Sequence, residues 1–263
     1  LLTIILKTIK GINIMKLLSI DTNAKTSKNT KYGYLTGIQY LSPYNTSGVN
    51  LCPMAEKAGC IKSCLYYSGR GKFKNVQQAR LNRTKLYLTN QPEYFNQLIT
   101  EIQALIKKAA KKELHPLIRL NGTSDIRWEN IGFTFEDTYY RNIFEFFPDI
   151  QFMDYTKIPN RVDSKNGLDN FPSNYDLTFS YSGAPAFKKY NQRAIDKGVR
   201  IAVVFDKVET IPLQFHGRKV LSGDDNDLTF TKPKGSILAL YAKGAKAEIQ
   251  AGIDTQFILT KGV

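Results

Sequence analysis

The chain has 263 residues, of which 42% are hydrophobic and 12% aromatic, enough apolar material for a full core in one large domain or two small ones. The aromatic content excludes a disordered protein. The formal net charge of +14 at pH 7 favours association with anions, so nucleic acid or a nucleotide is the first partner that the sequence suggests.

The first fourteen residues, LLTIILKTIKGINI, are apolar but include Lys7 and Lys10. This run is too short and too charged for a membrane-spanning helix, and no small-residue cleavage site follows it. We therefore expect no membrane partner, a cytoplasmic location and reduced thiols. Met15 resembles a natural start, which leaves open whether residues 1–14 belong to the native protein. We expect residues 1–31 to form a partly disordered N-terminal extension.

The first half of the chain predicts two strands and two helices. The strands are expected at 16–20 and 32–41, and the helices at 76–88 and 93–113. The second helix has the clearest periodicity in the protein. Its apolar stripe consists of Phe95, Leu98, Ile99, Ile102, Leu105, Ile106 and Ala109.

Beyond the second helix, short apolar strands alternate with helical stretches. The strands are expected at 116–120, 150–154, 177–179, 201–205 and 236–241, and the helices at 134–147 and 185–197. Alternation at this spacing indicates βαβ units and a mostly parallel sheet. Since no low-complexity linker divides the sequence, we expect one α/β domain over residues 32–263.

All three cysteines lie in one stretch rich in glycine, proline and serine, LSPYNTSGVNLCPMAEKAGCIKSCLYYSGRG. Cys52, Cys60 and Cys64 have the spacing C-x7-C-x3-C, and an odd number of thiols cannot pair completely in disulfides. Three thiolates suit an iron–sulfur cluster with one open iron, or a zinc ion whose fourth ligand comes from elsewhere. The plainer alternative is a set of ordinary buried thiols, which have no reason to cluster in such a loop.

Polar residues follow the expected strands, and in a parallel sheet ligands bind at the carboxyl ends of the strands. The candidates are Asn121, Gly122, Ser124, Asp125, Asp154, Thr156, Lys157, Ser180, Ser182, Asp206 and Lys207. Lys157, Arg161 and Arg70 have the charge to neutralise a carboxylate or phosphate. Each segment taken alone is also typical of ordinary loops.

Two further segments allow a functional and a structural interpretation. Asp125 next to the only tryptophan, Trp128, suits contact with a base or ribose hydroxyl, but equally an N-cap with Trp128 in the core. The acidic segment SGDDND, with Asp224, Asp225 and Asp227, has oxygen ligands for magnesium or calcium. Its spacing is not that of a calcium loop, so we expect a solvated turn.

Several common enzyme classes are excluded. The sequence contains no Walker loop, GxGxxG or HExxH motif, which argues against the usual ATPases, dinucleotide dehydrogenases and zinc proteases. His115 and His216 are isolated in the sequence, so nothing local supports either as a zinc ligand or as the partner of a catalytic cysteine.

Six segments resemble a phage-associated family known as gene product 88. In order between Tyr32 and Val263 they are LSPYNTSGVNLCP, GCIKSCLYYSGRG, RLNGTSDIRWE, DYTKIPNR, LTFSYSG and RIAVVFD. The Thr-Lys-x-Pro-x-Arg motif of that family matches Thr156, Lys157, Pro159 and Arg161.

A cysteine loop after the first strand of a parallel barrel also resembles the radical S-adenosylmethionine (radical SAM) enzymes. In these, three thiolates hold a 4Fe–4S cluster whose fourth iron chelates the amino and carboxylate groups of the nucleoside. The usual spacing there is C-x3-C-x2-C with an aromatic residue before the last cysteine. Here the spacing is longer, and Tyr66 and Tyr67 follow the last cysteine.

The resemblance implies a radical SAM-like partial (β/α) barrel with Cys52, Cys60 and Cys64 as cluster ligands. The residues implied for S-adenosylmethionine are Asn121, Gly122, Ser124, Asp125, Ser180 and Ser182. Charge and position after the strands, independent of the resemblance, make Arg70, Asp154, Lys157 and Arg161 the candidates for binding the substrate. The substrate itself stays open, with nucleic acid or a nucleotide as the first candidate.

Two alternatives to the radical SAM-like enzyme remain. One is a phage-encoded nucleic-acid-binding protein in which the same cysteines hold a structural zinc. The other is a barrel with a metal-free cysteine loop. A phage origin would place the protein in the cytoplasm of a bacterial host.

Overall fold

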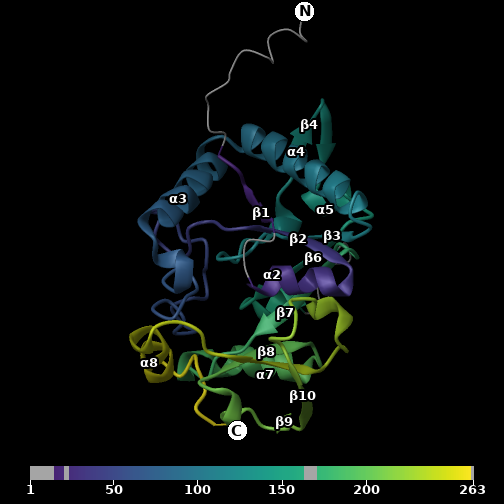
Figure 1. The fold of residues 1–263 in the computed structure, drawn as a ribbon. Coiled ribbons are helices and arrows are strands. Elements are labelled where there is room, and N and C mark those ends of the chain that lie inside the picture. The colour runs from purple at the N-terminus through teal and green to yellow at the C-terminus, as the bar shows by residue number, and fades with distance from the viewer. Residues whose placement is uncertain (1–14, 21–23, 163–170, 262–263) are drawn as a thin grey trace, which may run out of the picture.

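The structure is a computed structural model that describes residues 15–20, 24–162 and 171–261. The expectation for residues 1–14 lies outside these ranges. The described residues form a mixed α/β fold built on a nine-stranded sheet (Figure 1). Its strands, in spatial order, are β1 (Leu18–Ile20), β2 (Tyr34–Gln39), β3 (His115–Arg119), β6 (Gln151–Thr156), β7 (Tyr175–Ser180), β8 (Ile201–Phe205), β11 (Ile237–Tyr241), β10 (Arg218–Ser222) and β9 (Gln214–Phe215).

The strands from β2 to β10 in this order all pair in parallel, whereas β1 and β9 add antiparallel edges. From β2 to β11 the order in the sheet follows the order along the chain. When successive strands are added in one direction by right-handed crossovers, all the connections lie on the same face of the sheet. The other face is then left for a cleft. The expected α/β fold with mostly parallel strands is confirmed. Among the described residues the sheet stays open, because the two edge strands, β1 and β9, do not pair with each other.

The main helices lie close to where the sequence predicts them. The helices are α2 (Ala24–Asn29), α3 (Lys74–Thr89), α4 (Gln91–Ala110), α5 (Ile143–Phe146), α6 (Pro159–Val162), α7 (Lys188–Asp196) and α8 (Lys246–Asp254). Asn90 separates α3 from α4, and its side chain accepts the N–H of Glu93 at 3.3 Å. This cap explains why α4 begins earlier than expected. No helix in the described ranges has the length and apolar character to cross a bilayer.

The prediction of a helix over 134–147 is wrong. Its first part forms a hairpin of β4 (Phe133–Phe135) and β5 (Thr138–Tyr140), and only four residues of α5 follow. Glu136 and Asp137 make the two-residue turn with φ of 47° and 62°. Such a turn matches the twist of the strands, and the aromatic and β-branched residues beside it favour extended backbone.

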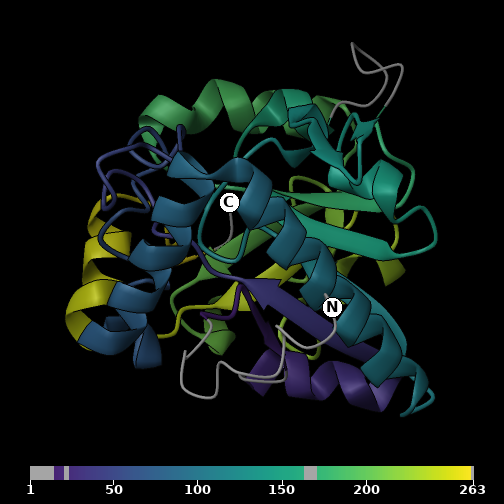
Figure 2. The same ribbon diagram turned by 90° about the horizontal axis from the view of Figure 1, so that it is seen from above.

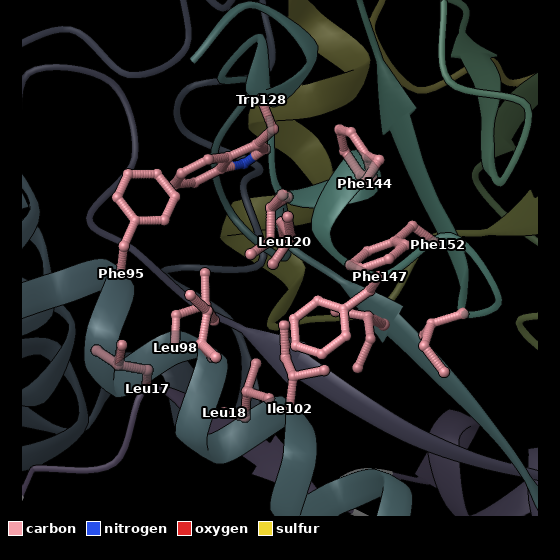
Figure 3. Packing of buried hydrophobic residues seen from close by; sticks show 14 of the residues in the cluster. Leu17, Leu18, Phe95, Leu98, Ile102, Leu120, Trp128, Phe144, Phe147 and Phe152 are labelled. Atoms are coloured by element: carbon pink, nitrogen blue, oxygen red, sulfur yellow. The ribbon is translucent and has the colours of Figure 1, made fainter. Parts of the chain in front are cut away.

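The largest core cluster lies between α4 and the first strands of the sheet. Figure 2 shows α4 lying across these strands, and Figure 3 shows Phe95 beside Trp128, with Leu98 and Ile102 on the side of Leu120. The predicted apolar stripe of α4 is thus its buried face, with Ile106 at the margin. Trp128 is fully buried here and stacks on Tyr94 at 6.1 Å, so its structural interpretation is confirmed.

Leu98→Ala tests this packing. Leu98 is 0% exposed, so its truncation leaves a cavity and should lower the free energy of unfolding by roughly 2–5 kcal/mol. Urea unfolding followed by circular dichroism measures the loss. The matched control is Leu88→Ala on α3, which is 38% exposed and should change stability far less. Equal losses in the two variants would contradict this account of the core.

Candidate functional site

A cleft of about 1500 Å³ opens over one face of the sheet and its carboxyl edge. Alternate residues of the strands form its floor, including Arg119 of β3, Tyr155 of β6 and Ser180 of β7. Cys52, Cys60 and Cys64 all line its wall. The loop that carries them lies on the side of the molecule where Figure 1 shows α3 and α8.

The cysteine loop has little secondary structure of its own, and the strand ends hold it in place. The N–H of Asp125, after β3, donates to the carbonyl of Leu51 at 2.8 Å. Ser182, after β7, donates its hydroxyl to the carbonyl of Ala58 at 2.7 Å. Thr255, after α8, donates to the carbonyl of Gly59 at 2.7 Å. Three separate elements therefore determine the path of the loop.

Two glycines allow these close approaches. Gly59 has a φ of +65°, and a Cβ on it would lie 2.6 Å from Cβ of Thr255. A Cβ on Gly122, in the turn after β3, would lie 2.5 Å from the carbonyl oxygen of Gln39. A larger residue at either position would push the loop or the turn away from the strand ends.

All three cysteines are free, half-buried thiols. Burial raises the pKa of Cys52, Cys60 and Cys64. For Cys64 the pKa rises to about 11, although the N–H of Tyr66, 3.5 Å from its Sγ, opposes the rise. Without a cation the thiols are therefore protonated at neutral pH. A metal ion would have to displace these protons to bind.

The chemistry of the donors suits a thiolate-held metal, since three free thiols of one loop face one cleft. In the ranges that the structure describes, however, no three Cys, His, Asp or Glu side chains form a group placed to hold a metal ion. Metal binding would thus have to draw the sulfurs together. The metal centre and its cofactor stay predictions.

Lys157 brings a positive charge to the thiols. Its Nζ donates to Oγ of Ser180 at 2.8 Å and lies 4.4 Å from the ring centre of Phe257. Burial lowers the pKa of Lys157, and Cys60 is the main group that opposes this shift. An anion in this part of the cleft would stabilise the ammonium.

A buried ion network stands behind this wall. Arg161 donates to both carboxylate oxygens of Glu129 at 2.8 Å and to Oδ1 of Asp125 at 2.7 Å. Asp125 also accepts the hydroxyl of Thr156 and the N–H of Lys157, each at 2.8 Å. The three charges satisfy one another and fix the turn after β3 against the end of β6.

The turn after β3 is organised by Asn121. Its Oδ1 accepts the N–H of Ile126 and the hydroxyl of Ser124, both at 2.9 Å, and Nε1 of Trp128 at 3.2 Å. Asp154 accepts the N–H of Asn121 at 3.0 Å, and burial raises the pKa of Asp154 to about 7. The side chains of Asn121 and Asp154 thus hold the backbone of this turn in place.

The structure brings most of the predicted site residues together. Those that line the cleft are Cys52, Cys60, Cys64, Arg70, Asn121, Gly122, Ser124, Asp125, Thr156, Lys157 and Ser180. Asp154, Arg161 and Ser182 lie behind it in the contacts described above.

The ion pairs on the far side of the cleft were not predicted from the sequence. Arg119 forms an ion pair with Asp227, which also accepts the hydroxyl of Tyr155 at 3.3 Å, and Lys243 pairs with Asp224. The expected solvated turn at SGDDND is therefore wrong for Asp227, which is buried. Its partner is 108 positions away, so no local signal could have found the pair.

Arg161→Gln tests the ion network. Removing the guanidinium leaves Glu129 and Asp125 buried without their partner, which should cost about 3–5 kcal/mol of stability. Chemical denaturation gives the change in unfolding free energy. The control is Arg141→Gln, because Arg141 is 65% exposed and pairs with Glu145 on the surface. A loss no larger than that of the control would contradict the proposed network.

A comparison with protein families matches the Gene product 88 family to residues 15–261. No curated protein and no solved structure matches the chain. The family match spans almost the whole sequence, including the cysteine loop and every strand of the large sheet. The chain therefore belongs to the gene product 88 family.

Proposed function

We propose that the protein is an iron–sulfur protein that binds a 4Fe–4S cluster through Cys52, Cys60 and Cys64, and that it acts as a radical SAM-like enzyme. The observation that carries the proposal is the position of three free thiols on one loop at the carboxyl edge of a parallel sheet, facing one large cleft. Ligands of parallel α/β sheets bind at this edge.

The winding of the sheet supports the partial-barrel interpretation. Its strands from β2 to β11 follow the chain order, as in barrels, whereas doubly wound sheets reverse direction at a switch point. The sheet face that lines the cleft thus corresponds to the interior of a partial barrel. The ligand would lie between this face and the cysteine loop.

When bound, the cluster would supply an electron and an open iron position for S-adenosylmethionine. The residues of the chain bind and orient the nucleoside. Lys157 offers an ammonium for its carboxylate, and the backbone of Gly122 to Ser124 lies at the same end of the cleft. The buried network around Asp125 keeps both segments in position.

A structural zinc in a nucleic-acid-binding protein is the second candidate, and the net charge of +14 favours it. Zinc with three thiolates takes a fourth ligand, commonly histidine. The two histidines lie elsewhere, His115 beside Tyr34 at 5.6 Å and His216 beside Tyr181 at 5.8 Å. This position of both imidazoles favours the cluster. A phage-type function would place either protein in the cytoplasm of a bacterial host.

Metal and sulfide analysis of anaerobically purified protein tests the proposal. We expect about four irons and four sulfides per chain and a brown colour. Cys60→Ser should lose most of this iron because one of three ligands is gone. Ser63→Ala, in the same loop and also lining the cleft, should keep it. About one zinc and no iron would support the second candidate, and no metal in either form would contradict both.

The raised pKa of the thiols predicts how the metal-free protein reacts with iodoacetamide. The thiolate is the reactive form, so labelling of Cys64 should be slow at pH 8 and rise as the pH approaches about 11. Unfolding in urea should restore fast labelling near pH 9. The raised pKa of Cys64 also makes stability depend on pH. Its contribution to the free energy of unfolding is fully present below about pH 9 and is lost as the pH rises further. Peptide mass spectrometry measures labelling, and fast reaction of folded protein at pH 8 would contradict the prediction.

A further inference from the structure

The buried face of α3 is polar where a helix of this length usually buries apolar residues. Its buried side chains are Arg80, Thr84 and Tyr87, which lie on one stripe at helical spacing. The hydroxyl of Thr84 accepts the N–H of Ser42 at 2.8 Å and donates to the carbonyl of Arg80 at 2.9 Å. Thr84 therefore holds the start of the cysteine loop, but no such contact accounts for Arg80.

The guanidinium of Arg80 is enclosed, and two of its donor atoms are unpaired among the described residues. Arg80 is 6% exposed, and its charge lies 5.1 Å from the ring centre of Tyr40 and 5.3 Å from that of Tyr66. Its Nε and Nη1 are buried and have no hydrogen-bond partner among the described residues. Such unpaired donors cost free energy unless a ligand satisfies them.

Other buried guanidinium groups of the protein face carboxylates. Arg161 pairs with Asp125 and Glu129, and the pairs Arg119–Asp227 and Arg200–Asp176 follow the same rule. The titratable groups that act on Arg80 are Tyr40, Cys64 and Tyr66. Phenols are uncharged near neutral pH, so the two rings beside Arg80 carry no countercharge. Burial in turn lowers the pKa of Arg80.

Arg80 lines the cleft on a wall with three other cations, Arg70, Lys72 and Arg83. Arg83 donates to the carbonyls of Lys16 and Tyr40 and is partly balanced by Glu101. The acidic groups that line the cleft already have partners: Asp125 has Arg161, Asp224 has Lys243, Asp227 has Arg119, and Glu248 accepts the N–H of Ala245. The wall at Arg80 therefore carries an excess of positive charge.

We infer that Arg80 anchors a phosphate group of a ligand that binds in the cleft. The planar guanidinium donates two parallel hydrogen bonds to such a group, and the tyrosine rings hold its plane in place. A group with two negative charges suits a wall of several cations better than a single carboxylate does. A volume of about 1500 Å³ leaves room for the rest of a nucleotide-sized molecule. The substrate class is thus a phosphorylated compound.

Pyrophosphate is the probe, and its affinity is measured by thermal shift and calorimetry at constant ionic strength set with chloride. The wild-type Tm should rise with pyrophosphate concentration. In Arg80→Met the affinity should fall roughly tenfold to hundredfold, the loss of a charge-assisted pair of hydrogen bonds. Without ligand, Arg80→Met should be at least as stable as the wild type, because a buried unpaired charge is removed. Arg141→Gln is the control and should bind as the wild type does.

Arg80→Lys is the second variant, since it keeps the charge between the rings and should fold even if Arg80→Met does not. It should bind pyrophosphate about tenfold more weakly, because an ammonium lacks the fork of donors. The same titrations in a Cys60→Ser background separate phosphate binding at Arg80 from metal binding by the cysteines. The loss of pyrophosphate affinity in the Arg80 variants should persist in that background. Equal pyrophosphate affinity in wild type and both variants would overturn the inference. Stabilisation by succinate equal to that by pyrophosphate would overturn the assignment to phosphate.

Discussion

The buried carboxylate of Asp125 is the contact on which the candidate site depends. It accepts hydrogen bonds from Thr156 and from the backbone of Lys157, and it pairs with Arg161. Its own backbone N–H donates to Leu51, the residue before Cys52. One residue therefore links the end of β3, the end of β6 and the cysteine loop. Since the carboxylate is buried, these bonds are strong and directional and allow the three segments little freedom.

The protein buries several guanidinium groups, and they differ in whether their hydrogen-bond donors are paired within the protein. Arg161 donates hydrogen bonds to Glu129, Asp125 and the hydroxyl of Tyr175, so it holds these neighbouring residues in position. Arg80 has rings on two sides, and the part of the chain that the structure describes gives its Nε and Nη1 no hydrogen-bond partner. A fold selected for stability alone would place an apolar side chain there. The cost of Arg80 is understandable if a bound anion completes its hydrogen bonds.

The same reasoning connects Arg80 and Lys157 with the cysteines. Burial disfavours both the ammonium of Lys157 and the thiolate of Cys60, and each group reduces the shift of the other. A bound metal cation would stabilise the ionised thiols, and an anionic ligand would stabilise the two cations, Arg80 and Lys157. Each of these charges is costly to bury without its partner. The cleft is thus built for charged contents. The apolar part of its floor, with Ala202 and Val204, would exclude water from them.

The sequence by itself determined the elements with strong local signals. The period of α4, the apolar runs of the parallel strands and the clustering of three cysteines after β2 were all readable, because each depends on residues close together in the chain. The hairpin at Phe133–Tyr140 was missed because its turn uses Glu136 and Asp137 with positive φ in place of the usual Asn-Gly.

Only the tertiary structure decided which polar residues face the cleft. Arg161 and Lys157 lie four positions apart, yet one is buried in an ion network and the other lies beside the thiols. Asp227 and Arg119 meet across the sheet from 108 positions apart. Arg80 looks like an ordinary helix residue until Tyr40 and Tyr66 enclose it. A sequence shows which residues are charged but not what surrounds them. The surroundings in the folded protein decide whether a cation is solvated, paired with a carboxylate or available to a ligand.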